Sequence, residues 1–226
     1  NPTHHGWSTR RQTAYDRIHL GLTERLPGCG VASPKRGQIT RMVTLGELLT
    51  VGGSDWLHIG GKVRAPGWKI LDAIAADHVD IVADLRDLSG IGDGAFDAVY
   101  ASHVLEHLSH RGELESVTRA LHRILRIGGK LFVSVPDMDI LSRLFSSDSI
   151  SPGDKFAVMV KMFGGQSDKF DYHTIGLNQQ FLMDYLYLGG FRDAYKVPAF
   201  GFFPDASSAT VAGVPFSLNV VAIKTA

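Results

Sequence analysis

The sequence lacks the features of a disulfide-bonded, membrane-spanning or strongly nucleic-acid-binding protein. Cys29 is the single cysteine, which excludes an internal disulfide framework and a zinc site made of several cysteines. Lys+Arg 23 equals Asp+Glu 23, so no excess of positive charge favours nucleic acid or an anionic membrane as a partner. No apolar run approaches the ~20 residues that cross a bilayer, and no signal-peptide core is visible. We therefore expect a cytoplasmic protein without nucleic-acid or membrane partners.

The length of 226 residues favours one globular domain with an appended segment. Helical spacing of apolar residues predicts an amphipathic helix over about 9–26 and a short helix near 44–49. Gly52-Gly53-Ser54 then separates this region from the first strand. We predict an N-terminal helical extension over 1–54 and an α/β domain over 55–226. The extension either packs against the domain or covers a ligand cleft.

Three short apolar segments in 55–85 each run into a glycine or an aspartate. They are Trp56–Ile59 before Gly60 and Gly61, Trp68–Leu71 before Asp72, and Val79–Ala83 before Asp84. In open α/β sheets, ligands bind at the carboxyl ends of the strands. Glycine there lets a ligand approach the backbone, and carboxylates accept hydrogen bonds from hydroxyl groups. This pattern indicates one half of a nucleoside-binding edge.

The rest of the chain continues the alternation of strands and helices. Further strands are predicted over 96–101, 131–135, 191–197 and 218–224, and helices over 111–126, 138–145, 153–163 and 178–188. Asn178 is the expected N-cap of the helix 178–188, and Phe181 is expected among the inward residues of that helix. Gly128-Gly129 is expected to end the helix 111–126. Apolar strands alternating with helices favour a largely parallel sheet that is covered on both faces. The connections 61–67 and 73–78, however, are shorter than the dozen or so residues of a usual parallel crossover.

Taken in order, the segments IGG, LDA, ADL, FDAVYASHVLEHL and LRIGGKLFVSVPD resemble the class I S-adenosylmethionine-dependent methyltransferases. They are most similar to the branch in which a short loop ending in Pro-Gly-Trp replaces the first crossover helix. The resemblance covers about 55–136 well and continues more loosely to the terminal strand, with 1–54 outside it. It implies a Rossmann-like three-layer α/β sandwich, whose seven-stranded, mostly parallel sheet has an antiparallel last strand. The implied cofactor is S-adenosylmethionine, and the implied product is S-adenosylhomocysteine.

The same resemblance assigns roles to the residues at the strand ends. Gly60 and Gly61 would approach the methionine moiety of the cofactor, and Asp72 would accept hydrogen bonds from the ribose hydroxyls. Asp84 would face the adenine amino group, and Leu85 would supply backbone contact and an apolar wall. These assignments agree with simple chemistry, because a diol needs a carboxylate acceptor and adenine needs an acceptor between apolar faces.

Three further residues complete the expected cofactor site. Ser102 and His103 follow the strand 96–101, and the resemblance places them beside the methionine part near the methyl group. Lys62 departs from the family, since its position usually holds the second glycine of a Gly-x-Gly loop. Its side chain either crowds the amino-acid end of the cofactor or pairs with the cofactor carboxylate. A degenerate, non-catalytic binding or scaffold protein therefore stays open as the alternative.

Histidines provide the candidate bases. His173, close to Asp171 on a loop that precedes a helix and is expected to border the acceptor pocket, is either a general base or a residue that braces the loop. His103 and His107 stand at i and i+4 around Glu106, a spacing with which two histidines can share a metal ion. The resemblance favours a structural role for Glu106 and His107, so no metal is expected.

The sequence therefore predicts an enzyme that transfers a methyl group to a small-molecule or saccharide acceptor. The acceptor class rests on the resemblance, because the related branch is often associated with glycan modification. A nicotinamide-dependent oxidoreductase would also bind its cofactor at the carboxyl ends of the strands, but it would need a fuller G-x-G-x-x-G motif leading into a helix. The oligomeric state and the methylated atom are not determined by the sequence.

Overall fold

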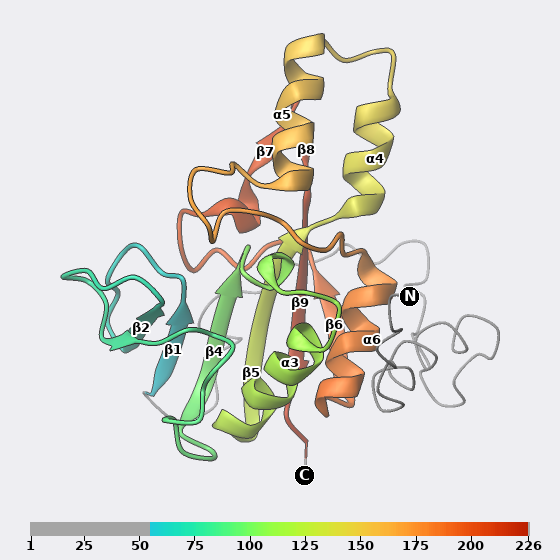
Figure 1. Ribbon diagram of the computed structural model, residues 1–226. Helices are drawn as coiled ribbons and strands as arrows, with labels where there is room; N and C mark the ends of the chain where they lie inside the picture. Colours follow the sequence, from blue (N-terminus) through green and yellow to red (C-terminus); the bar gives the residue numbers. More distant parts are fainter. Residues whose placement is uncertain (1–54, 226) are drawn as a thin grey trace, which may run out of the picture. The chain divides into compact units, whose positions relative to one another are not determined.

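The computed structural model describes residues 55–225, so the extension predicted over 1–54 lies outside the described residues. The centre of the fold is one seven-stranded sheet with the order β3-β2-β1-β4-β5-β9-β6 (Figure 1). In chain order its strands are β1 Trp56–Ile59, β2 Trp68–Asp72, β3 Ile81–Val82, β4 Phe96–Ser102, β5 Leu125–Pro136, β6 Asp193–Val197 and β9 Ser217–Ile223.

Strand directions match the predicted fold class. The pairs from β3 through β2, β1 and β4 to β5 are all parallel. The last strand, β9, inserts between β5 and β6 and is antiparallel to both. The prediction of a mostly parallel seven-stranded sheet with an antiparallel last strand is confirmed.

The short connections that the sequence predicted are present as loops without helices. β1 and β2 pair in parallel with Trp56 opposite Trp68, although only 60–67 joins them. Arg64 braces this loop, because its guanidinium donates to Asp80 Oδ1 at 3.0 Å and to the Asp77 carbonyl at 2.8 Å. Asp80 Oδ2 also accepts from Ile70 N at 2.8 Å, which ties the second loop to β2. Side-chain hydrogen bonds thus hold these two connections in place, where a parallel crossover usually has a helix.

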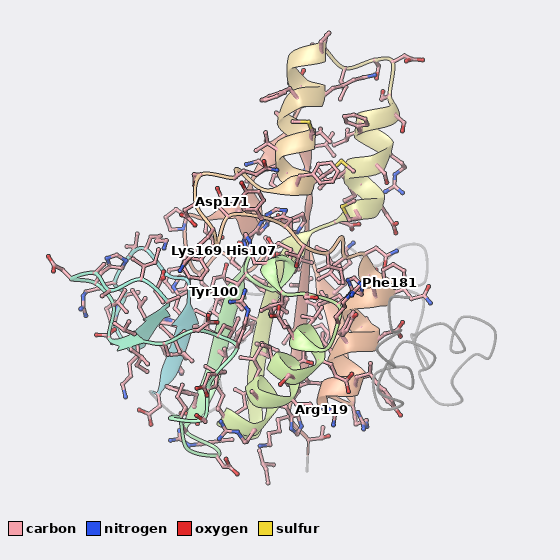
Figure 2. All side chains as sticks on the ribbon, viewed as in Figure 1. Tyr100, His107, Arg119, Lys169, Asp171 and Phe181 are labelled. Atoms are coloured by element: carbon pink, nitrogen blue, oxygen red, sulfur yellow. The ribbon has the colours of Figure 1, made fainter. Side chains whose placement is uncertain are left out.

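Two helices pack against one face of the sheet. α3 (Glu113–Ile124) and α6 (Gln179–Gly189) lie side by side there (Figure 1). Asn178 caps α6 as predicted, since its side-chain oxygen accepts from Phe181 N at 3.0 Å. The inward orientation expected for Phe181 is wrong: its side chain is 39% exposed and lies on the outer side of α6 (Figure 2). The buried residues of the helix are Leu182, Tyr185, Leu186 and Gly189.

The opposite face of the sheet carries a cluster of aromatic side chains. Its buried members come from strands and from the segment 198–203, and within residues 55–225 the cluster contains no helical residue. Tyr100 lies at its centre and is fully buried, with Trp68, Phe200, Phe202 and Phe203 around it. Trp68 therefore packs within this cluster on the face of the sheet.

The predicted bounds of two strands need correction. β5 begins at Leu125, directly after α3, and runs through Gly128 and Gly129, where the sequence predicted the end of the helix. Pairing with the end of the chain extends the strand, because Gly128 N donates to Lys224 O and Lys224 N donates to Gly129 O. β3 is shorter than predicted, with only Ile81 and Val82 in the sheet.

The chain after β5 builds a second layer beyond the carboxyl ends of the strands (Figure 1). α4 (Met138–Ser146) and α5 (Pro152–Phe163) form a hairpin that packs with the small sheet of β7 (Thr210–Val211) and β8 (Val214–Pro215). Two 3-10 turns, η1 (Leu105–His107) and η2 (Ala206–Ser208), complete the described elements. None of the described helices is long and apolar enough to cross a membrane.

Candidate functional site

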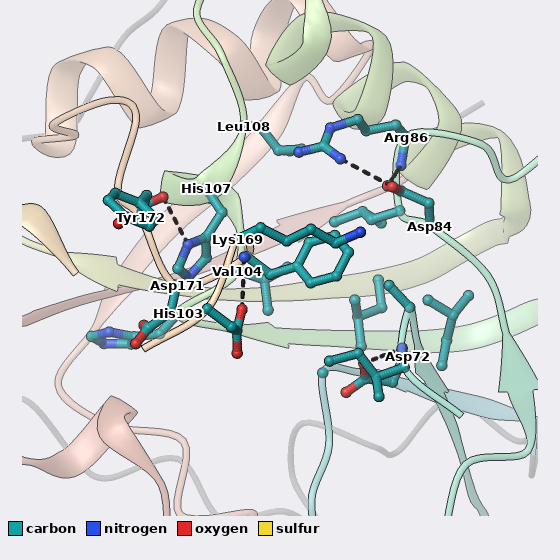
Figure 3. A pocket seen from close by; sticks show the side chains of 18 of the residues that line it. Asp72, Asp84, Arg86, His103, Val104, His107, Leu108, Lys169, Asp171 and Tyr172 are labelled. Atoms are coloured by element: carbon teal, nitrogen blue, oxygen red, sulfur yellow. Dashed lines mark hydrogen bonds and ion pairs between the residues drawn. The ribbon is translucent and has the colours of Figure 1, made fainter. Parts of the chain in front are cut away.

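A cavity of about 390 Å³ opens at the carboxyl ends of β1, β2 and β4. This volume lies within the range of about 300–1,000 Å³ that is usual for small-molecule sites. Seven of the eight residues predicted to bind the cofactor line it: Gly60, Lys62, Asp72, Asp84, Leu85, Ser102 and His103. Figure 3 shows Asp72 and Asp84 on one side, with His103, His107 and Tyr172 on the other.

The two glycines after β1 have different roles. Gly60 lines the cavity with a φ of +71°, where glycine is favoured, and a Cβ there would come within 3.3 Å of Val104 Cγ2. Gly61 is not a lining residue, and a Cβ on it would lie 2.7 Å from His58 Nδ1. Gly60 therefore shapes the cavity, whereas Gly61 permits close packing of the loop on β1.

Asp72 is paired with the lysine that interrupts the glycine pattern. Lys62 Nζ donates to Asp72 Oδ2 at 2.7 Å, and Ile74 N donates to Asp72 Oδ1 at 2.9 Å. Burial works to raise the pKa of Asp72, but the hydrogen bonds from Lys62 and Ile74 and the lysine charge hold it below its usual value. The lysine side chain is 72% exposed, so the ion pair lies at the mouth of the cavity. Each oxygen of the ionised carboxylate keeps a lone pair that can accept a ribose hydroxyl.

Asp84 has an arginine partner that the sequence did not single out. Arg86 N donates to Asp84 Oδ1 at 2.9 Å and Arg86 Nη1 to Asp84 Oδ2 at 3.0 Å, while Arg86 Nε lies 3.2 Å from Glu113 Oε1. Apolar side chains line the cavity near these strand ends, among them Leu85 and the 52% exposed Ile74. An acceptor between apolar walls is the environment that an adenine ring requires.

The other side of the cavity is formed by the segment 167–172, of which the sequence pointed only to Asp171 and Tyr172 as part of a loop bordering the acceptor pocket. All six of its residues line the cavity, and they include Asp168, Lys169, Phe170 and Tyr172. Lys169 lies across the cavity between the two groups of side chains in Figure 3. Residues 167–170 gave no signal in the sequence, because this segment has neither a helical nor a strand period.

The histidine predicted beside the methyl group occupies a strained backbone position. His103 has a φ of +53°, which is uncommon for a residue other than glycine and clusters at functional sites. Its Nε2 lies 2.8 Å from Ser217 Oγ, and its Nδ1 lies 3.4 Å from Glu106 Oε1. Burial, followed by the nearby His173, lowers the pKa of His103 to about 3, so the ring is neutral at pH 7.

His173 does not line the cavity but lies next to Glu106. Its Nε2 is 3.9 Å from Glu106 Oε1, and its ring meets the His107 ring at a centroid distance of 4.9 Å. Burial and then the proximity of His107 lower the pKa of His173 to about 4. Burial raises the pKa of Glu106 to about 8. The structure thus gathers His103, Glu106, His107 and His173 around one buried carboxylate.

Comparison with known proteins places the strand-end residues in a recognised domain. Residues 69–133 match the family model described as a methyltransferase domain. No curated protein matches the sequence.

Two solved structures that resemble the chain are methyltransferases. One is a SAM-dependent methyltransferase from Archaeoglobus fulgidus, with 15% identity and a TM-score of 0.47 over 75% of this chain and 85% of that one. The other is the 1,6-didemethyltoxoflavin-N1-methyltransferase of Burkholderia thailandensis, solved with 1,6-didemethyltoxoflavin and S-adenosylhomocysteine. It has 14% identity and a TM-score of 0.49 over 100% of this chain and 94% of that one. Similarities of this degree do not by themselves establish a shared activity.

The matched segment carries the cavity's defining residues, from Asp72 at the end of β2 to His103 after β4. The sheet around it is seven-stranded and mostly parallel, with the antiparallel last strand that the sequence resemblance implied. The match of residues 69–133 to a methyltransferase domain and the observed sheet thus agree with the resemblance to the class I S-adenosylmethionine-dependent methyltransferases.

Proposed function

We propose that this enzyme transfers the methyl group of S-adenosylmethionine to a small hydroxylated molecule or a saccharide. The observation that supports it most directly is the cavity at the carboxyl ends of β1, β2 and β4. Polar and aromatic side chains of 167–172 form its wall opposite Asp72. Such side chains suit an acceptor that presents hydroxyl groups and an apolar ring face.

The proposed cofactor contacts are those that the family resemblance implies, and the position of these residues at the strand ends supports them. Asp72 accepts hydrogen bonds from the ribose hydroxyls, and Asp84 with Leu85 receives the adenine. Gly60 leaves room for the methionine moiety, which Ser102 and His103 flank. Bound S-adenosylmethionine supplies an electrophilic methyl group on a sulfonium. The work of the protein is then to orient the acceptor in line with that methyl group and to exclude water.

An acceptor hydroxyl must lose a proton as it is methylated, so the site needs a proton acceptor. His103 and His173 are the candidates from the sequence, and of these two only His103 lines the cavity. Cytoplasmic location and the helical extension over 1–54 stay predictions from the sequence.

The test is a turnover assay that measures release of S-adenosylhomocysteine from S-adenosylmethionine. The purified chain is offered panels of small alcohols, phenols, amines and oligosaccharides. We expect turnover with at least one hydroxylated compound and its loss in the Asp72→Ala variant. Asp77→Ala, an exposed aspartate on the loop after β2, is the matched control and should keep full activity. Turnover with amines alone would contradict the proposed acceptor class.

A further inference from the structure

Glu106 is a buried carboxylate for which the described residues supply no hydrogen-bond donor. Its side chain is 1% exposed, and neither Oε1 nor Oε2 has a hydrogen-bond partner. Oε1 lies 3.4 Å from His103 Nδ1 and 3.9 Å from His173 Nε2. A carboxylate buried in this way is costly unless it carries a proton or contacts a cation.

The hydrogen bonds of His103 leave it unable to donate to Glu106. Ser217 Oγ donates its only proton to the Ala206 carbonyl at 2.7 Å. His103 Nε2, 2.8 Å from the same hydroxyl oxygen, must therefore carry a proton and donate. In the neutral ring Nδ1 then has a lone pair, and this lone pair faces Glu106 Oε1.

Of the other two histidines, His107 has one ring nitrogen committed to a backbone carbonyl. His107 Nδ1 lies 3.1 Å from the Tyr172 carbonyl oxygen, which only accepts, so this nitrogen is protonated and Nε2 has the lone pair. His173 Nε2 lies 3.9 Å from Glu106 Oε1. Histidines that bind metals use this arrangement, in which the second nitrogen donates to a carbonyl and fixes the tautomer.

We propose that Glu106, His107 and His173 bind a divalent transition-metal ion. One ligand atom from each residue lies within 4.8 Å of the other two. Two imidazole nitrogens and one carboxylate form a donor set that suits zinc, manganese, iron or cobalt. Ligands about 2.0–2.2 Å from a common ion stand ~3–4 Å apart, so side-chain shifts of about an ångström complete the site. The ion takes the place of the proton that Glu106 otherwise needs.

The backbone holds these residues together although His173 is distant in the sequence. Thr174 N donates to the Glu106 carbonyl at 2.8 Å, and Ile175 N donates to it at 3.3 Å. These bonds fasten the loop that carries His173 to the η1 turn that carries Glu106 and His107. The sequence-based expectation of no metal considered the pair His103 and His107, whereas the structure adds His173 and a buried carboxylate.

The position of the site gives the ion access to substrate. His107 lines the cavity, so an ion bound to it has open coordination positions toward the cavity. If the proposed function holds, an oxygen of the acceptor coordinates there, and His173 acts as a ligand rather than as a base. Metal binding itself does not depend on the proposed function.

The test is metal titration of the full-length chain, freed of any histidine tag and treated with chelator. Co²⁺ is added while visible absorption is recorded, and Zn²⁺ and Mn²⁺ binding are measured by calorimetry. We expect one site for which Glu106→Gln and His173→Ala weaken binding at least tenfold. His110→Ala is the control, because this exposed histidine lies close by in the sequence but outside the cluster. It should bind as the wild type does.

Thermal unfolding provides a second readout that does not require the alanine variant to fold. The wild type should melt at a higher temperature with metal, whereas Glu106→Gln, which keeps the size of the side chain, should not respond. Equal metal affinity in the wild type and Glu106→Gln would overturn the proposal. So would the absence of a metal effect together with unchanged or higher stability of Glu106→Gln, since an amide mimics a protonated carboxyl. Donor binding by S-adenosylmethionine is measured separately, so its failure is distinguishable from failure of the metal site.

Discussion

At the scale of single residues, Lys62 decides whether the departure from the Gly-x-Gly pattern damages the cofactor site. Its backbone does not need glycine, because it is not among the described non-glycine residues with positive φ. Its side chain forms an ion pair with Asp72 but is 72% exposed. Exposed ion pairs contribute about 0–1 kcal/mol, so a ligand displaces this one at little cost. The lysine therefore does not by itself favour a degenerate protein.

We predict that Lys62→Gly changes the affinity for S-adenosylmethionine by less than about fivefold, the equivalent of about 1 kcal/mol. The physical reason is that the variant loses both the competing ion pair and the pairing with the cofactor carboxylate, each of which is largely solvated. Calorimetric titration measures the change. Binding tightened by far more than tenfold would show that Lys62 obstructs the site and would favour the non-catalytic alternative.

His58 is a second residue with a measurable consequence, this time for stability. It is 6% exposed on β1, between the aromatic rings of Trp68, Tyr100 and Phe203. Burial lowers its pKa from 6.5 to about 4, outweighing the opposing effect of Asp205. Below pH 6.5 His58 is protonated in the unfolded chain but stays neutral in the folded chain, so its contribution lowers the unfolding free energy as the pH falls toward 4.

The wild type should lose unfolding free energy when the pH falls from 7 to 5, and we predict that in His58→Phe this loss is smaller by roughly 2 kcal/mol. Chemical denaturation at both pH values measures it, and comparison within each protein cancels the packing cost of the larger ring. His110→Ala, which removes an exposed histidine, should keep the wild-type pH dependence. Equal pH dependence in wild type and His58→Phe would mean that the buried ring is already protonated.

At the scale of elements, periodicity predicted the helices well and the strands unevenly. α4, α5 and α6 begin and end within about two residues of the predicted bounds, because caps such as Ser151 and Asn178 mark their starts. The prediction that Gly128-Gly129 ends α3 was wrong, because these glycines lie within β5, although such a pair often follows the end of a helix. Gly129 in fact sits where a Cβ would lie 2.8 Å from the Arg126 carbonyl, inside an extended strand. Only the pairing with the distant strand β9 explains that conformation.

The N-cap of α6 allows a test of the prediction that local capping fixes the start of this helix. We predict that Asn178→Ala lowers the unfolding free energy by about 1 kcal/mol, because Phe181 N loses its acceptor. Asn178→Ser, which restores an accepting oxygen, should recover most of the loss. Denaturant unfolding of the three proteins measures both effects. An Asn178→Ala variant as stable as the wild type would show that this cap contributes nothing.

At the scale of the whole molecule, the family resemblance made predictable what periodicity alone left open. It supplied the seven-stranded, mostly parallel sheet with its antiparallel last strand, the bare connections after β1 and β2, and seven of the residues that meet in the cavity. Glycine and aspartate at strand ends are visible in a sequence because parallel strands bring their carboxyl ends together. The pairing of Asp84 with Arg86, the wall formed by 167–172 and the cluster around Glu106 were not predictable. Each depends on loops whose positions are set by tertiary hydrogen bonds, such as those from Thr174 and Ile175 to Glu106.

The most direct test of the central claim is calorimetric titration with S-adenosylmethionine and S-adenosylhomocysteine. We predict micromolar binding of both by the wild type and by the Asp77→Ala control. Asp72→Ala should bind about tenfold more weakly, since a charge-assisted hydrogen bond to the ribose is lost. No heat of binding at millimolar ligand, or equal affinity in the wild type and Asp72→Ala, would contradict the account of this cavity as the cofactor site.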